Sequence, residues 1–227
     1  MKVILFGASG MVGQGVLREC LLADDVTQVL AVGRRPLGPA QPRLRELLRE
    51  DFLDYADAEA ELRGYDACFF CLGVSSLGLD EAEYTRVTYD YALAAARVLA
   101  RLNPSMVFVF VSGAGTDASE QGKRMWARVK GRTENALRAL PFRAVYLFRP
   151  GAIRPVHGVR SKTRWTQRFY NWTGPLTALA RALFPRQVAS TESIGRAMLE
   201  VVRHGAPQAV VPPAGIEALS RQAVARA

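Results

Sequence analysis

Short runs of almost wholly apolar residues recur along the chain and alternate with longer stretches whose apolar residues lie three or four positions apart. The runs indicate strands that are buried on both faces, and the longer spacing indicates amphipathic helices. We expect strands over residues 2–6, 26–32, 65–72, 106–111, 142–148 and 209–211. Because these strands alternate with helices, the pattern predicts an α/β protein built on a doubly wound parallel sheet.

The helical spacing begins at residue 11 and recurs over 80–102, 119–140, 192–203 and 216–225, with Thr191 as the expected cap of the fourth helix. Residues 44–48 are ambiguous, because their leucines have helical spacing although a doubly wound sheet needs its third strand here. We expect a short strand.

Residues 153–190 are less regular than the rest of the chain. Their apolar residues recur at spacings of three to four and are interrupted by Gly174-Pro175, which predicts two short helices joined by a kink. We therefore expect a single domain over 1–227, with a small irregular, mostly helical C-terminal part that contains a basic subregion over 153–204.

The net charge of +9 is concentrated in residues 151–204, where nine Lys and Arg stand against two Glu. Three functions stay open for this segment: a substrate lid, a homodimer surface, and a face for an anionic partner such as a membrane surface. The plain alternatives are a solvated basic surface and an apolar stripe that packs on the core. No helix-turn-helix, zinc spacing or basic–aromatic RNA motif is present, so no nucleic-acid partner is expected.

No apolar run is long enough to span a bilayer, and the first strand follows Met1 directly, so we expect a cytoplasmic protein. Three cysteines fit a reducing compartment. Cys68 and Cys71 fall in an expected strand, and we interpret them, like Cys20, as core thiols. His157 and His204 lie far from clustered acids, so no metal site is expected.

A glycine-rich turn follows the first strand and opens the first helix, with the spacing G-x-x-G-x-x-G. In such a turn the first glycine allows a tight bend, the second lets the backbone approach a pyrophosphate, and the third lets the helix pack on the strand. The N–H groups of the helix N-terminus then face the phosphates. A bare structural turn is the alternative. The expected dinucleotide contacts are Gly7, Ala8, Ser9, Gly10, Met11, Val12 and Gly13.

The end of the second strand indicates which dinucleotide is bound. A site for NAD places a carboxylate here for the ribose hydroxyls, whereas a site for NADP needs cations for the 2′-phosphate. The sequence has no acid here and has Arg34 and Arg35. We therefore predict NADP(H), against the alternative of two arginines on a solvated loop. The adenine is expected near Asp51 and Phe52, with Asp51 accepting a hydrogen bond from its amino group.

Together, five motifs resemble the extended or atypical branch of the short-chain dehydrogenase/reductase family. They stand in the family's order over about residues 1–155: Gly7-Ala-Ser-Gly10-Met-Val-Gly13, Cys71-Leu-Gly73, Val111-Ser112-Gly-Ala-Gly, Val129-Lys130-Gly131 and Arg149-Pro150-Gly151. Within the family, the chain is similar to the Tat-interacting-protein-like reductase group. The resemblance implies a Rossmann fold, an oxidoreductase or epimerase-like activity, and further cofactor contacts at Leu72, Gly73, Lys130 and Pro150.

The family's chemistry uses a Ser that orients the substrate oxygen, a Tyr that transfers the proton, and a Lys that lowers the pKa of the phenol and holds the nicotinamide ribose. Ser112 and Lys130 match this pattern. Four residues before the lysine, where the Tyr belongs, this chain has Trp126. An indole N–H donates a hydrogen bond but does not titrate near neutrality, so Trp126 cannot serve as the general acid.

Three functions remain open on this sequence. In the first, the protein is an NADP-dependent oxidoreductase for a small carbonyl substrate, and the proton comes from Ser112, His157 or water. In the second, it has kept the cofactor and lost the chemistry, and it acts as a regulator or scaffold. In the third, it is a binding module that uses the basic segment 151–204.

Overall fold

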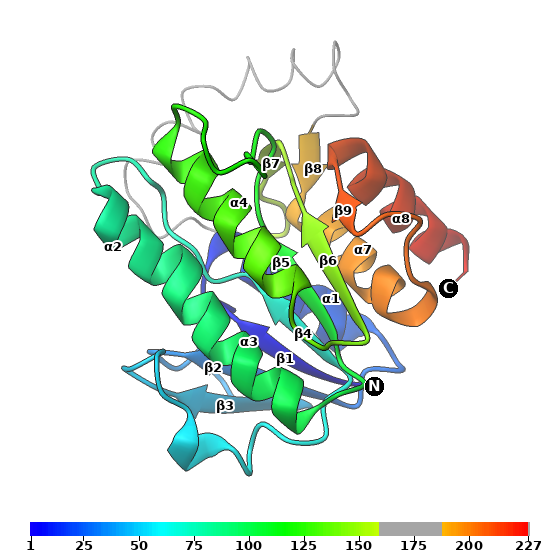
Figure 1. The fold of residues 1–227 in the computed structure, drawn as a ribbon. Helices are drawn as coiled ribbons and strands as arrows, with labels where there is room; N and C mark the ends of the chain where they lie inside the picture. Colours follow the sequence, from blue (N-terminus) through cyan, green and yellow to red (C-terminus); the bar gives the residue numbers. More distant parts are fainter. Residues whose placement is uncertain (159–187, 227) are drawn as a thin grey trace.

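The computed structural model describes residues 1–158 and 188–226, and within them a parallel sheet of seven strands forms the centre of the molecule (Figure 1). The strands are β1 (Lys2–Phe6), β2 (Gln28–Gly33), β3 (Leu44–Leu48), β4 (Ala67–Phe70), β5 (Val107–Val111), β6 (Ala144–Phe148) and β9 (Val210–Val211). Their order in the sheet is β3-β2-β1-β4-β5-β6-β9. The direction of winding therefore changes between β1 and β4, and the predicted doubly wound α/β fold is confirmed.

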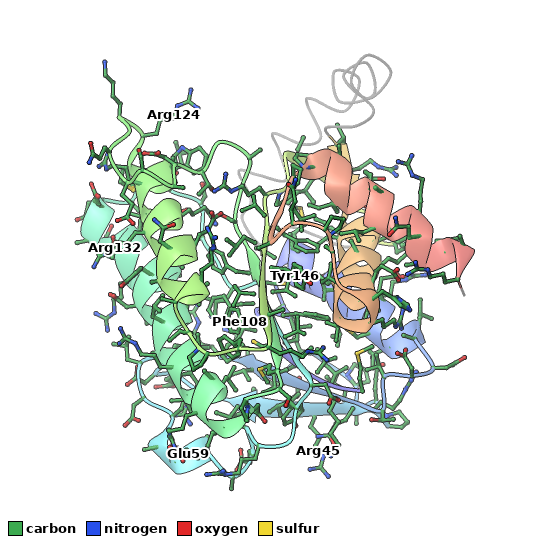
Figure 2. All side chains as sticks on the ribbon, turned by 45° about the vertical axis from the view of Figure 1, so that its right-hand side comes forward. Arg45, Glu59, Phe108, Arg124, Arg132 and Tyr146 are labelled. Atoms are coloured by element: carbon green, nitrogen blue, oxygen red, sulfur yellow. The ribbon has the colours of Figure 1, made fainter. Side chains whose placement is uncertain are left out.

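Helices cover both faces of this sheet (Figure 1). One face carries α1 (Met11–Leu22), α7 (Thr191–His204) and α8 (Pro213–Ala225), and the other carries α2 (Glu81–Thr85), α3 (Tyr91–Leu102) and α4 (Met125–Arg138). Each face has its own core of buried apolar side chains. Figure 2 shows Phe108 inside the molecule, whereas the charged side chains of Arg124 and Arg132 point outward. Both faces of the central strands are thus buried, as their apolar sequences predict.

The ambiguous segment 44–48 is a strand, β3, which pairs in parallel with β2 in the register Ala31↔Glu46. The helix expected over 80–102 begins as predicted, because Asp80 accepts a hydrogen bond from the N–H of Glu83 at 2.8 Å and caps α2. A π-helical turn over Arg86–Asp90 separates α2 from α3, and the apolar spacing did not predict it.

The last helix, α8, begins three residues before the predicted start, and two other helix starts differ from the prediction because of side-chain hydrogen bonds. Residues 119–124 are not helical, because the Asp117 carboxylate accepts hydrogen bonds from the N–H groups of Ser119 at 3.0 Å and Gly122 at 2.6 Å and closes a loop. The cap of α7 is Ser190 rather than Thr191: the Ser190 hydroxyl accepts from the N–H of Ser193 at 2.9 Å. Thr191 is instead fully buried.

The C-terminal part contains a strand pairing that the sequence did not predict. Within the described residues, β7 (Ala152–Arg154) pairs in parallel with β8 (Val188–Ser190), outside the main sheet. The two short helices expected within 153–190 fall mostly on residues 159–187, which lie outside the described residues, as does most of the basic segment.

The contact between α1 and α7 requires a glycine at position 15. A Cβ at Gly15 would lie 2.5 Å from Thr191 Cβ and 2.6 Å from Thr191 O. Beside this contact, Arg196 Nε of α7 donates to the buried Glu19 carboxylate of α1 at 3.0 Å. Close packing and a shared ion pair therefore hold these two helices together on one face of the sheet.

We expect Gly15→Ala to lower the free energy of unfolding by about 1–3 kcal/mol, because α1 and α7 must separate to admit the methyl group. Gly33→Ala is the matched control, since a Cβ there has no atom within 4 Å. Denaturant unfolding of both variants checks this prediction, and equal stabilities would contradict it.

Candidate functional site

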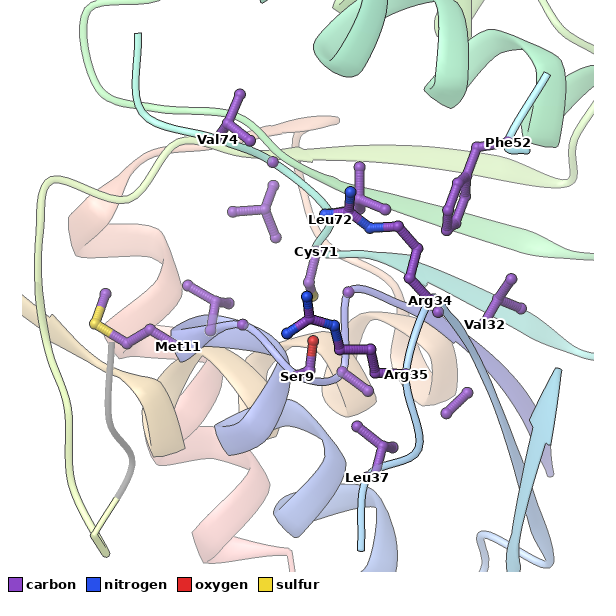
Figure 3. Close-up of a pocket in the computed structure, with 18 of the residues that line it drawn as sticks. Ser9, Met11, Val32, Arg34, Arg35, Leu37, Phe52, Cys71, Leu72 and Val74 are labelled. Atoms are coloured by element: carbon purple, nitrogen blue, oxygen red, sulfur yellow. The ribbon is translucent and has the colours of Figure 1, made fainter. Parts of the chain in front are cut away.

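A cavity of about 650 Å³ opens at the carboxyl ends of β1, β2, β4 and β5, where the winding of the sheet changes direction (Figure 3). In doubly wound sheets this is the position at which ligands bind. Most of the residues predicted as a site line this cavity: Gly7, Ala8, Ser9, Gly10, Met11, Val12, Arg34, Arg35, Phe52, Leu72, Gly73, Ser112 and Lys130.

The glycine turn has three different local constraints. Gly7 has φ +77°, and a Cβ there would lie 2.6 Å from the backbone N of Leu72. At Gly13 a Cβ would lie 2.0 Å from Gly7 O, so the glycine lets α1 pack against the turn, and Gly13 itself does not line the cavity. At Gly10 a Cβ would meet only Gly7 O, at 3.2 Å. The turn thus leaves an open backbone cradle at Gly10, where α1 begins.

Two arginines stand at the end of β2, on the cavity. Arg34 and Arg35 are exposed, and neither makes an ion pair or hydrogen bond with any residue that the structure describes. Figure 3 shows both side chains projecting into the cavity. The nearby Glu46 of β3 accepts a hydrogen bond from the N–H of Leu37 at 2.7 Å and so holds the loop that follows the arginines.

The two residues expected at the adenine are placed differently. Phe52 is buried, lines the cavity, and packs against Tyr91 with ring centroids 5.5 Å apart. Asp51 is exposed and does not line the cavity, because its carboxylate turns back to accept from the N–H of Leu53 at 2.8 Å. The structure therefore brings Phe52 to the site and leaves Asp51 out of it.

Ser112 follows β5 and is buried. Its Oγ lies 2.9 Å from Oγ1 of Thr116, and that hydroxyl donates to Gly113 O at 2.8 Å. Since Thr116 has only one hydroxyl proton, the Ser112 proton points to Thr116, and the Ser112 lone pairs remain available to accept. Thr116 is a contact that sequence reasoning missed, and no motif indicates it.

Lys130 of α4 is half-buried on the cavity, directly beside the end of β5. Its Nζ donates to Val111 O at 3.2 Å and lies 5.3 Å from the centroid of the Phe110 ring. Burial lowers the pKa of this ammonium group to about 8, and the charge of Glu134 opposes that shift. Glu134 is itself buried, and it accepts from Nε of Arg149 at 3.0 Å, so its charge is compensated in part.

Two predicted site residues lie beside the cavity rather than in it. The ring of Trp126 lies against the loop after β5, since a Cβ at Gly115 would be 3.5 Å from its Cη2 and one at Gly113 would be 3.8 Å from its Cζ3. Pro150 is buried and accepts from the N–H of Ala114 at 2.9 Å, so it supports the same loop. Neither lines the cavity.

His157, an expected alternative proton source, is also outside the cavity, and its Nε2 lies 3.0 Å from the Glu192 carboxylate.

Cys71 differs from the expected core thiol because it is only half-buried and lines the cavity, whereas Cys20 and Cys68 are buried. Burial raises the pKa of all three thiols.

Among residues 1–158 and 188–226, no three His, Cys, Asp or Glu residues gather as metal ligands, and no helix is long and apolar enough to cross a bilayer.

Curated relatives were found, whereas no family model matches the chain. Protein HTATIP2 of Rattus norvegicus is 30% identical over 154 residues, which is 67% of this chain and 62% of that protein. The chain therefore spans less than two thirds of the rat relative. The mitochondrial protein fmp52 of Emericella nidulans is 27% identical over 206 residues, 86% of this chain and 84% of the relative.

Solved structures share the fold. The enzyme WbmF of Bordetella bronchiseptica in complex with NAD+ superposes with a TM-score of 0.67 at 18% identity, over 98% of this chain and 77% of that one. A short-chain dehydrogenase family protein of Francisella tularensis superposes with a TM-score of 0.69 at 13% identity, over 96% and 98%. At these identities the likeness concerns the Rossmann fold alone.

The expectation of a cytoplasmic protein is contradicted by these relatives, because several fungal FMP52 proteins are named as mitochondrial. The sequence argument used only the apolar runs and the position of the first strand, and neither distinguishes one compartment from another for a protein of this fold.

The pKa of Lys130 has a consequence for stability. Between about pH 8 and 10.5 the unfolded chain holds a proton that the folded protein has released, so wild-type stability rises with pH across this window. We expect Lys130→Met to be about 1–3 kcal/mol more stable than wild type at pH 7, and the difference to shrink toward pH 10. Denaturant unfolding over this pH range measures it.

The matched control is Lys123→Met, because Lys123 is exposed on the loop before α4. Its stability relative to wild type should not depend on pH. A Lys130→Met variant that behaves in the same way as this control would show that burial does not perturb Lys130.

Proposed function

We propose that this chain, which resembles the atypical branch of the short-chain dehydrogenase/reductase family, is an NADP(H)-dependent oxidoreductase acting on a small carbonyl or alcohol substrate. The observation that carries the proposal is the cavity with two different ends. Arg34 and Arg35, which pair with no residue that the structure describes, lie at one end, while Ser112 and Lys130 lie at the other.

The glycine turn fits a dinucleotide pyrophosphate. At Gly10 a Cβ would occupy the cradle that a phosphate needs, and the first N–H groups of α1 open onto the same space. The solved structure of WbmF, a protein of the same fold, contains NAD+, which favours a nicotinamide dinucleotide in this cavity. When bound, such a cofactor supplies or accepts a hydride.

Arg34 and Arg35 favour the phosphorylated cofactor. Guanidinium groups bind phosphate through charge-assisted, often bidentate hydrogen bonds, and these two have no competing carboxylate among the described residues. Glu46, the acid nearest in the cavity lining, is held by the N–H of Leu37. We therefore assign the 2′-phosphate to the arginines and exclude Glu46 from that contact.

Ser112 and Lys130 are assigned to the reacting end. The Oγ of Ser112, whose own proton is directed to Thr116, accepts a hydrogen bond from the hydroxyl of the alcohol and so orients it. Lys130 places a positive charge beside the same strand end, through its contact with Val111 O. A positive charge at this place stabilises negative charge on a substrate oxygen.

A cofactor-binding regulator without chemistry is the second candidate function. It is favoured by Trp126, whose ring lies against Gly113 and Gly115 and brings no titratable group to the site. Turnover of NADPH with a panel of small aldehydes, ketones and quinones distinguishes the two candidates. Cofactor-dependent reduction of any member supports the oxidoreductase, and tight NADPH binding without any turnover supports the regulator.

We expect replacement of Arg34 or Arg35 by Ala to weaken NADP binding by about 10- to 100-fold for each arginine, with little effect on NAD. Calorimetry with both cofactors measures this. Arg45→Ala is the control, because Arg45 is on the neighbouring β3 and points away from the molecule (Figure 2). Equal wild-type affinities for NADP and NAD would overturn the assignment.

Gly10→Val should fold and should lose binding of both cofactors. The extended backbone at Gly10, with φ −81° and ψ 167°, accepts a valine, but the side chain would fill the phosphate cradle. Circular dichroism controls for folding, and calorimetry reads out binding. A folded Gly10→Val protein with wild-type affinity would show that the turn has a structural role only.

A further inference from the structure

We propose that Lys130 itself donates the proton in carbonyl reduction, in the place of the phenol that the chain lacks. This inference rests on the proposed oxidoreductase function, and it assigns a proton donor that neither the motifs nor the relatives supply. It follows from which titratable groups reach the cavity and from how the Lys130 side chain is held.

Few side chains that line the cavity can exchange a proton. Within the described residues they are Arg34, Arg35, Glu46, Cys71 and Lys130. A guanidinium stays protonated at all working pH values. The Glu46 carboxylate accepts from Leu37 beside the arginine loop, away from Ser112. Burial raises the pKa of the Cys71 thiol, which makes it a weak acid. Lys130 is the group that remains.

The three other candidate donors are excluded by their positions or by their chemistry. His157 pairs with Glu192 of α7 and does not reach the cavity lining. The Ser112 proton is directed to Thr116, and a serine hydroxyl is too weak an acid to act alone near neutrality. Trp126 lies against Gly113 and Gly115, and its indole N–H does not titrate near neutrality.

The placement of Nζ suits a donor. It makes one hydrogen bond, to Val111 O at 3.2 Å, and an ammonium group has three protons. Val111 O belongs to the peptide group that leads into Ser112, and Lys130 and Ser112 both line the cavity. The proposal places the substrate oxygen in this cavity, where it accepts from Lys130.

The surroundings of Lys130 control when it releases a proton. On its own helix, α4, the charged group that acts on it is Glu134, which Arg149 at the end of β6 neutralises in part. From β5, Phe110 presents a ring and Val111 a carbonyl, and neither is charged. Cys71, directly after β4, is a neutral thiol because burial raises its pKa. Burial therefore dominates and brings the pKa of Lys130 to about 8, close to the pH at which a general acid works best.

The step balances as a carbonyl reduction. Hydride adds to the carbonyl carbon while a proton passes from Nζ of Lys130 to the carbonyl oxygen, which converts C=O into CH–OH. NADPH is thereby oxidised to NADP+. Lys130 is left as a neutral amine and regains a proton from water at the cavity opening. In the reverse direction, the neutral amine accepts the alcohol proton.

The first test measures the titration of the Lys130 ammonium group directly. The chain has four lysines, so NMR of lysine side chains labelled at Nζ resolves Lys130 in the whole protein, free and with NADP+. We expect a titration midpoint near pH 8 for Lys130 in the free protein and a midpoint still below the ordinary lysine value with NADP+ bound. A Lys130 midpoint equal to that of Lys123 in both states would overturn the proposal.

The second test uses Lys130→Arg, which keeps the positive charge but cannot release the proton. Wild-type reduction should fall as pH rises through the Lys130 midpoint. The variant should bind NADPH within about threefold of wild type and reduce the carbonyl about 10²- to 10⁴-fold more slowly, without that alkaline limb. Lys123→Arg, at an exposed position, is the matched control and should follow the wild-type profile.

The outcomes separate this inference from the function on which it rests. A Lys130→Arg protein that binds NADPH and keeps both the wild-type rate and the wild-type pH profile overturns the donor assignment while leaving the oxidoreductase intact. A wild-type protein that binds NADPH and reduces no carbonyl overturns the oxidoreductase, and the donor assignment falls with it.

Discussion

The close approach of α1 to the turn that precedes it is the constraint on which the rest of the site depends. A Cβ at Gly13 would lie 2.0 Å from Gly7 O, so only glycine lets the helix begin directly at the end of β1. This places the N-terminus of α1 over the carboxyl ends of β1, β2 and β4. The cavity, the open cradle at Gly10 and the approach of Arg34 and Arg35 from β2 all follow from that placement.

The other end of the cavity depends on how α4 is held against β5 and β6. Gly131 lets the loop after β5 approach the helix, since a Cβ there would lie 1.8 Å from Asp117 O. The buried Glu134 pairs with Arg149 at the end of β6 and fixes the rotation of α4. Lys130 immediately precedes Gly131 on α4, and it lines the cavity. Keeping a partly desolvated ammonium group at the cavity lowers the stability of the folded protein. The proposed proton donation gives a reason for this group to be there.

Much of the fold was predictable from the sequence because it depends on local patterns. The run 2–6 and the glycines at 7, 10 and 13 identify the first strand, turn and helix, and the topology requires the strand at 44–48 even though its spacing is helical. That Arg34 and Arg35 line the cavity was predictable from their position at the end of β2. The atypical short-chain dehydrogenase/reductase resemblance is confirmed by the relatives.

What the sequence did not predict depends on tertiary contacts. Asp51 turns away from the cavity to bind its own loop, and Trp126 rests on Gly113 and Gly115. No local pattern contains the Ser112–Thr116 pair, and the pairing of β7 with β8 joins segments far apart in the chain. The lowered pKa of Lys130 arises from burial, which cannot be predicted from a sequence motif.

The central claim is that this chain moves hydride between NADP(H) and a small carbonyl, and deuterium transfer tests it most directly. NADPH deuterated at the transferable position of the nicotinamide is incubated with the protein and the carbonyl panel, and the products are examined by mass spectrometry. The account predicts an alcohol that carries one deuterium on its carbinol carbon. Tight binding of the labelled cofactor without deuterium in any product would contradict it.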